Sequence, residues 1–190
     1  MTPQLVRRIE ADLDDVQLMA LVQAADASAF AALVKRHHGR CYALAWRILQ
    51  DRGGAEDAVQ EAFMKLWRGA ERFDPSRGRF TGWLTTITTR CCLDGRRLMK
   101  PVVDLEDAAT IADERPRADR LAEGRDVHRL MAQLPPRQRA AISLFYLEGQ
   151  TMHEVAHSLD SNMKSVESLL SRGRAALRAL YENTCSAGVT

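Results

Sequence analysis

A stretch near the carboxyl end of the sequence carries a motif typical of zinc-dependent hydrolysis. His153, Glu154 and His157 fit H-E-x-x-H, which places two imidazoles on one helix face beside a glutamate that acts as general base. The extended motif needs a glycine and a third histidine where this sequence has Asp160 and Met163. Few residues follow to build a substrate cleft. We therefore expect two solvated histidines and no metal site, and metal analysis of a His153→Ala variant would test the alternative of a zinc hydrolase.

The same stretch, residues 150–180, predicts two helices around a tight polar turn. Apolar residues share one face of the first helix and recur at steps of three and four in the second. Asp160, Ser161 and Asn162 supply turn and N-cap chemistry between them, because short polar side chains accept hydrogen bonds from the free amides that open a helix. The pattern indicates a helix-turn-helix, whose second helix can enter a major groove. Its outer face is basic and rich in hydroxyl groups, and includes Lys164, Ser165, Ser168, Ser171 and Arg172.

The composition favours an all-α protein that contains these helices. The 190 residues leave room for one mid-sized domain or two small ones, and 46% of them are hydrophobic. Aromatic residues make up 6% and there are 6 prolines, which argues against a β architecture and against extensive disorder. Residues 101–119 hold six acidic and two basic residues, a local charge of −4. Since the whole chain carries +2, the remainder carries +6, an excess that suits phosphate binding.

The cysteines and the apolar segments indicate the cellular compartment in which the protein works. No C-x-x-C pair occurs, so we expect reduced thiols, with redox sensing by Cys91 or Cys92, or metal binding by His37, His38 and Cys41, as alternatives. No long apolar span or cleavable signal is evident, which predicts a cytoplasmic protein.

The amino-terminal half predicts helices around an exposed basic loop. Helices are expected from residue 13 and from residue 28, the second ending at the glycine pair of residues 53 and 54. Residues 55–68 follow as an amphipathic helix with acids in its first turn and with Trp67 on its apolar face. Residues 73–80 read as a loop bearing Arg77 and Arg79, before a helix over residues 81–100 with a basic second half. Trp83 in that helix fits core packing, with a base-inserting wedge as the alternative.

The order of segments divides the chain into two small helical domains joined by an acidic linker. Residues 1–100 form the first domain, and residues 101–120, which lack periodicity and contain two prolines, form the linker. Residues 121–190 form the second domain, which contains the helix-turn-helix.

Three segments in this order resemble bacterial RNA polymerase sigma factors of the extracytoplasmic-function (ECF) group. GGAEDAVQEAFMKLWR is similar to the family's region 2.2, and FTGWLTTITTRCCLDGRR to its regions 2.3 and 2.4. LPPRQRAAISLFYLEGQTMHEVAHSLDSNMKSVESLLSRGRAALR is similar to its regions 4.1 and 4.2. The resemblance implies a transcription initiation factor that binds core RNA polymerase and promoter DNA, with no catalytic residues, cofactor or small-molecule substrate, and with an anti-sigma factor as a partner.

The resemblance also assigns residues to these roles. It implies polymerase docking by the polar face of Asp57, Gln60 and Glu61. It implies promoter contacts by Arg77, Arg79, Arg90, Arg96, Arg97, Lys164, Ser165, Ser168, Ser171 and Arg172. Arg90 stands where the family usually has asparagine, Glu167 where lysine is frequent and Leu169 where arginine is frequent, so the promoter sequence is not predicted. The main rival is a stand-alone DNA-binding regulator with a LuxR-type helix-turn-helix, against which the docking-like helix and the absence of an alternating strand–helix pattern argue.

Overall fold

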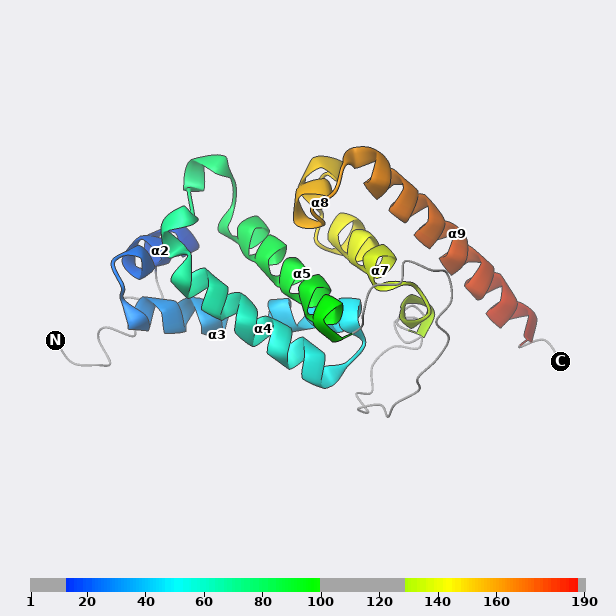
Figure 1. The fold of residues 1–190 in the computed structure, drawn as a ribbon, viewed down its shortest axis with the longest axis horizontal. Coiled ribbons are helices and arrows are strands. Elements are labelled where there is room, and N and C mark those ends of the chain that lie inside the picture. Colours follow the sequence, from blue (N-terminus) through cyan, green and yellow to red (C-terminus); the bar gives the residue numbers. More distant parts are fainter. Residues whose placement is uncertain (1–12, 100–128, 188–190) are drawn as a thin grey trace.

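A computed structural model of the chain describes residues 13–99 and 129–187, and within them the regular secondary structure is entirely helical. Figure 1 shows two groups of helices lying side by side, one from each half of the chain. The all-α expectation is confirmed. The predicted linker, residues 101–120, lies outside the described residues.

Within residues 13–99, the amino-terminal group contains four α-helices, and aspartate side chains cap the starts of three of them. It consists of α2 (Asp15–Gln23), α3 (Ala27–Leu49), α4 (Arg52–Arg68), the short 3-10 turns η1 (Ala70–Arg72) and η2 (Pro75–Arg77), and α5 (Phe80–Met99). Asp14, Asp26 and Asp51 accept hydrogen bonds from backbone amides at the starts of α2, α3 and α4. Each cap satisfies an amide that has no partner within its helix, and the negative charge suits the helix dipole there.

The boundary between α3 and α4 differs from the prediction. The glycine pair, Gly53 and Gly54, lies inside the first turn of α4 and does not end α3. Instead Gln50 takes a left-handed backbone conformation with φ of 55°, and Asp51 caps α4 through the Gly54 amide. The left-handed backbone of Gln50 and the side-chain cap of Asp51 therefore separate the two helices, the role that the prediction assigned to the glycine pair.

The carboxyl-terminal group contains the predicted helix-turn-helix. Within residues 129–187 it contains α7 (Pro136–Ile142), a π-helical turn η3 (Ser143–Leu147), α8 (Met152–Ser158) and α9 (Met163–Ala187), and residues 129–132 before α7 are also helical. Thr151 and Glu154 form a capping box that opens α8, and the Asn162 side chain accepts from the Ser165 amide to open α9. Asp160, with φ of 48°, makes the turn between them. The predicted order of short helix, polar turn and long helix is confirmed.

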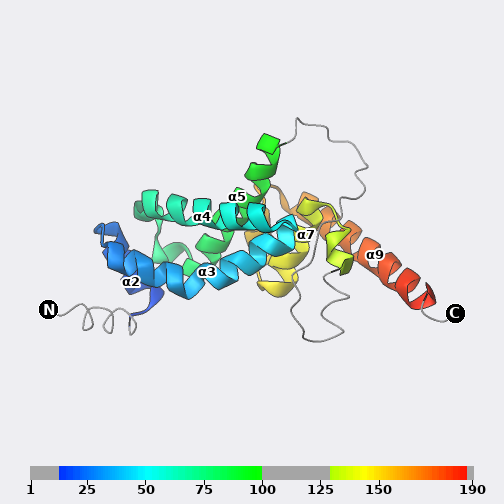
Figure 2. The ribbon, with the colours of Figure 1, turned by 90° about the horizontal axis from the view of Figure 1, so that it is seen from below.

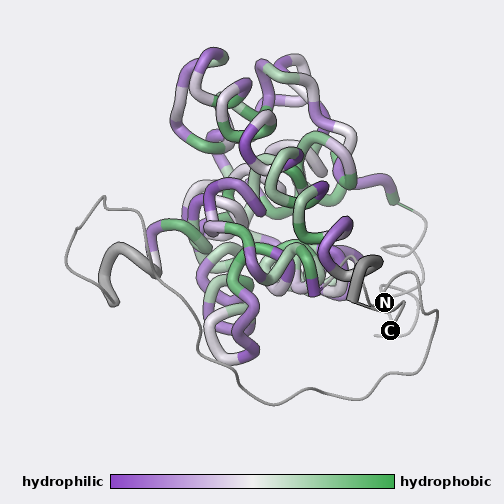
Figure 3. Tube along the Cα trace, turned by 90° about the vertical axis from the view of Figure 1, so that its right-hand side faces the viewer, coloured by the Kyte–Doolittle hydropathy of each residue, from purple (hydrophilic) through white to green (hydrophobic). Residues whose placement is uncertain are grey.

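The two groups share one continuous apolar core. Leu33, Leu66 and Leu144 are fully buried in it, as are Val155 and Val166 from the helix-turn-helix. In Figure 2, α7 lies beside the carboxyl-terminal part of α3, while the second half of α9 extends away from the other helices. Figure 3 shows the hydrophobic stretches alternating with hydrophilic ones along the helices, as amphipathic packing requires.

Gly173 allows α9 to pack closely on α7. A Cβ atom at this position would lie 2.6 Å from Cδ1 and 3.4 Å from Cγ1 of Ile142. We expect Gly173→Leu to lower the free energy of unfolding by about 1–3 kcal/mol, because the added side chain overfills this contact. Urea denaturation followed by circular dichroism measures the change.

Gly95 provides the matched control for that substitution. It is an exposed glycine of α5, and a Cβ atom added to it would meet no other atom within 4 Å, so Gly95→Leu adds the same side chain to open space. The control should be neutral or stabilising by up to about 1 kcal/mol, since leucine favours helix more than glycine does. Equal stability of the two variants would contradict close packing at Gly173.

Candidate docking face and nucleic-acid interface

The outward side of α4 carries the residues predicted to dock polymerase. Asp57 and Gln60 are exposed, and Glu61 is about half exposed with its Oε1 atom 3.9 Å from Nζ of Lys65. The opposite face of α4, which includes Val59 and Leu66, is buried in the core. The docking candidates are therefore available to a partner without any change in packing.

The structure extends this face by two apolar residues. Met64 is 40% exposed and Trp67 is 37% exposed, and steps of three and four place both on the same side of α4 as Asp57 and Gln60. The sequence analysis placed Trp67 on the buried face. The ring of Trp67 does contact that of Phe30, at 5.0 Å between ring centroids, but the residue remains partly exposed. The periodicity could not show this, because Trp67 lies at the edge of the apolar stripe.

The basic loop after α4 has a defined backbone. The Asp74 side chain accepts from the Ser76 hydroxyl and amide, and these hydrogen bonds lower the pKa of Asp74 below its usual value. Gly78 has φ of 151°, a conformation that residues with a Cβ rarely adopt. Arg77 and Arg79 flank this glycine, and both are exposed.

Helix α5 gives different environments to its predicted DNA-binding residues. Arg90 is partly buried, and its Nη2 atom donates to the carbonyl oxygen of His157 at 2.7 Å. The side chains of Arg96 and Arg97 lie outside the described residues. Trp83 packs against the rings of Phe73 and Phe80 at centroid distances of 5.4 and 6.4 Å, which supports core packing over a base-inserting wedge.

A polar groove lies along the first turns of α9. It has a volume of about 290 Å³. Its lining residues are Arg137, Ser161, Ser165, Ser168, Leu169 and Arg172. Three of the predicted DNA-binding residues thus meet in one place, whereas Lys164 and Ser171 are exposed on α9 outside the lining. No lining residue is acidic, so guanidinium and hydroxyl donors face the groove without a competing carboxylate, a chemistry that suits phosphate oxygens.

Arg137 and Ser161 are groove residues that the sequence analysis missed. Arg137 stands in the first turn of α7, and its Nη2 atom donates to the carbonyl oxygen of Leu159 at 3.1 Å, which holds the side chain across the turn of the helix-turn-helix. Periodicity within α9 carries no information on a residue of another helix. The only available signal was a basic residue directly after the proline pair.

Of the H-E-x-x-H residues, Glu154 helps to cap the start of α8. His153 and His157 are exposed, and Glu154 accepts from the amide and hydroxyl of Thr151 in the capping box. These hydrogen bonds lower the pKa of Glu154 below its usual value, and the charge of Arg79 contributes. Among residues 13–99 and 129–187, no three His, Cys, Asp or Glu side chains are grouped to hold a metal ion. Over the same ranges, no helix is both long enough and apolar enough to span a bilayer.

Three cysteines lie in the core of the amino-terminal group. Cys41, Cys91 and Cys92 are free thiols and buried, and burial raises the pKa of each, that of Cys92 to about 12. Thiolates are the reactive form. We expect iodoacetamide at pH 8 to modify Cys92 at least about 100-fold more slowly in the folded protein than in denaturant. Peptide-resolved mass spectrometry measures both rates, and equal rates would favour the redox-sensing alternative.

The fold and these surfaces define a class of protein: a helical group with an exposed polar and apolar face on α4, packed against a helix-turn-helix group with a basic groove, as in bacterial transcription initiation factors. Family models agree on both halves. Sigma-70 region 2 matches residues 33–100, and Sigma-70, region 4 matches residues 124–177.

Curated relatives and solved structures are similar over most of the chain. The ECF RNA polymerase sigma factor SigK of Mycobacterium sp. (strain KMS) is 33% identical over 172 residues, which covers 87% of this chain and 88% of the relative. SigK of Mycobacterium tuberculosis (strain ATCC 25177 / H37Ra) is 33% identical over 180 residues, covering 91% and 94%. The chain belongs to the ECF RNA polymerase sigma factors.

Two solved structures share the fold. CnrH, solved in complex with the cytosolic domain of CnrY, has a TM-score of 0.61 at 26% identity, covering 89% of this chain and 97% of CnrH. RpoE of Bartonella quintana, solved with the anti-sigma factor NepR, has a TM-score of 0.59 at 23% identity, covering 80% and 96%. As a sigma factor the chain binds core RNA polymerase and directs promoter-specific initiation, and the family is not known for enzymatic activity.

Proposed function

We propose that the outward face of α4 docks core RNA polymerase and that two basic surfaces of the chain contact promoter DNA. Asp57, Gln60 and Glu61 provide the docking contacts, with Met64 and Trp67 extending them. The loop with Arg77 and Arg79 and the helix with Arg90, Arg96 and Arg97 hold the minus-ten element, where an unstacked base costs a few kcal/mol that pocket and phosphate contacts offset. The groove on α9 holds the minus-thirty-five element, with Lys164, Ser165, Ser168, Ser171 and Arg172.

We further propose a function for each part of the chain, a regulatory partner and a cellular compartment. Residues 1–100 form the docking and minus-ten domain, residues 101–120 a linker, and residues 121–190 the minus-thirty-five domain. An anti-sigma factor holds the protein inactive until a signal releases it, in line with the complex that RpoE of Bartonella quintana forms with the anti-sigma factor NepR. The protein works in the cytoplasm, where polymerase and promoter are.

The observation that carries this proposal is the groove of α9, whose six lining residues include two arginines, three serines and no acid. It lies on the second helix of a helix-turn-helix, the element that enters a major groove. The acidic and apolar docking face lies on α4, in the other group of helices. A protein with one surface suited to DNA and a separate one suited to a protein partner can bind both at once.

Titration of the purified chain against core RNA polymerase lacking any sigma factor tests the proposal, followed by transcription from a library of promoter fragments. Tight binding with new, sequence-dependent start sites is expected, and the selected fragments would define both promoter elements. Failure of a folded, inhibitor-free sample to bind polymerase would contradict the proposal and favour a stand-alone DNA-binding regulator.

A further inference from the structure

Glu167 is an acidic residue on the exposed side of α9, in the second turn of the helix. The buried side of α9 at this level is formed by Val166 and Leu170, whereas Glu167 is exposed. Lys164 and Ser171 are exposed too, and by their spacing they are its neighbours on the same face of the helix. Glu167 therefore stands between two residues that the proposed function places on promoter DNA.

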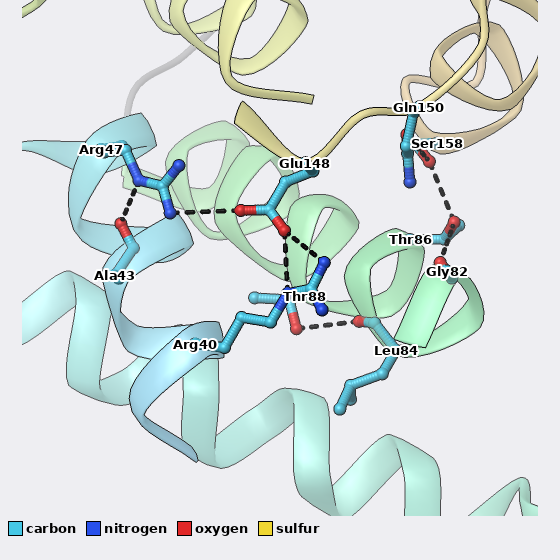
Figure 4. A network of polar contacts seen from close by, with 10 residues as sticks. All are labelled: Arg40, Ala43, Arg47, Gly82, Leu84, Thr86, Thr88, Glu148, Gln150 and Ser158. Carbon is cyan, nitrogen blue, oxygen red and sulfur yellow. Dashed lines mark hydrogen bonds and ion pairs between the residues drawn. The ribbon is translucent and has the colours of Figure 1, made fainter. Parts of the chain in front are cut away.

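Two other acidic residues of the carboxyl-terminal group are held by partners within the fold. The carboxylate of Glu148 accepts from Nε of Arg40 at 2.9 Å and from Nη2 of Arg47 at 3.1 Å (Figure 4). Glu154 accepts from the amide and the hydroxyl of Thr151 at the start of α8. Both carboxylates thus have a structural role that accounts for their charge.

The carboxylate of Glu167 has no such partner. Within residues 13–99 and 129–187 it takes part in no hydrogen bond or ion pair, although Lys164 lies one turn before it. It does not cap α9 either, because the Asn162 side chain accepts from the Ser165 amide there. The fold therefore leaves the charge of Glu167 free to act on a ligand.

A free carboxylate on a DNA-binding helix is favourable only where a base donates to it. Phosphate oxygens repel it, and the groove with Arg137 and Arg172 already supplies the donors that suit phosphates. The amino-terminal residues of the second helix of a helix-turn-helix contact base edges in the major groove. A carboxylate accepts hydrogen bonds and donates none. Cytosine presents only a donor on this edge, whereas adenine adds an acceptor that would repel the second carboxylate oxygen.

We propose that Glu167 specifies a cytosine in the minus-thirty-five element by accepting a hydrogen bond from the amino group of that base. The inference rests on the proposed function, which places the minus-thirty-five element on α9. It divides this surface into a groove that binds phosphates and a neighbouring row of side chains in which Glu167 reads sequence.

A comparison of the unmodified chain with Glu167→Gln tests the inference. Each protein is combined with core RNA polymerase, and transcripts from a promoter library randomised over the minus-thirty-five element are sequenced. We expect the unmodified chain to select cytosine at one position, and Glu167→Gln to lower this selection at least about fivefold. Adenine should gain at the same position, because a glutamine amide both donates to and accepts from an adenine edge.

Glu71→Gln is the matched control, since it removes the same charge from an exposed residue of η1, outside the helix-turn-helix. It should leave every base preference unchanged, and circular dichroism reports whether each variant is folded. A promoter in which the selected cytosine is replaced by thymine gives the converse test. This replacement should weaken initiation at least about fivefold with the unmodified chain and much less with Glu167→Ala, because only the former has a carboxylate to lose its partner.

The outcomes separate this inference from the proposed function. Unchanged cytosine selection by a folded Glu167→Gln protein would overturn the inference. Stronger initiation by that variant at all sequences alike would also overturn it, because Glu167 would then only repel phosphate. If the unmodified chain does not bind polymerase, the proposed function fails. Selection of random DNA duplexes by the chain alone then decides the cytosine preference by the same comparison of variants.

Discussion

Reversing two charges on α4, with Asp57→Lys and Glu61→Lys, is expected to lower the affinity for core RNA polymerase by at least about 100-fold. Both side chains point away from the core, and neither caps a helix. The substitutions therefore place repulsive charges in the proposed docking face while the bundle of α2 to α5 stays packed. Fluorescence anisotropy of labelled protein titrated with polymerase measures the affinity, and circular dichroism reports the fold.

The control variant, Glu71→Lys/Asp94→Lys, makes the same change in net charge at two other exposed acidic residues. Glu71 lies in η1 and Asp94 in α5, on elements other than α4. Its affinity for polymerase should remain within about threefold of the unmodified protein, the range expected of a peripheral charge. A folded Asp57→Lys/Glu61→Lys protein that binds as well as this control would show that α4 is not the docking face.

Reversing the charge at the two arginines of the α9 groove, with Arg137→Glu and Arg172→Glu, is expected to weaken the binding of the polymerase complex to promoter DNA about 100-fold or more. The arginines line one groove from two different helices, so their loss removes positive charge where phosphates are proposed to lie. The dependence of binding on salt should also become shallower, by roughly one unit of slope for each lost phosphate contact. Polymerase binding itself should change little.

Arg174 and Arg178 supply the matched control on the same helix. Both are exposed on α9 and neither lines the groove. Arg174→Glu/Arg178→Glu changes the net charge equally, so a larger loss of promoter affinity in the groove variant would identify the groove itself and not the overall charge. Loss of polymerase binding in the groove variant would instead show that α9 takes part in docking.

Local patterns in the sequence were sufficient for much of this fold. Steps of three and four predicted the buried face of α4 and of α9, because a helix repeats its environment every 3.6 residues. Short polar residues marked the turn before α9, where Asn162 caps the helix as expected. The ordered motifs also identified the family, which the models for regions 2 and 4 confirm. The assignment of particular residues to polymerase and DNA remains a prediction.

The wrong predictions concern a residue pair at the end of a helix and a residue at the edge of an apolar stripe. The glycine pair near residue 53 suggested a helix end, yet a favourable cap from Asp51 let α4 begin before it. Trp67 sits at the border of the apolar stripe, where periodicity alone cannot decide between burial and exposure.

The sequence by itself determined the helices, their inward faces, the helix-turn-helix and the family, because each depends on residues a few positions apart or on the order of motifs. Only the tertiary structure brought Arg137 into the groove of α9, Arg90 against the carbonyl of His157, and Glu148 between Arg40 and Arg47. Arg40 and Glu148 are 108 residues apart, a distance over which helical periodicity carries no information. Their contact depends on how the two groups of helices pack, and only the folded structure shows that packing.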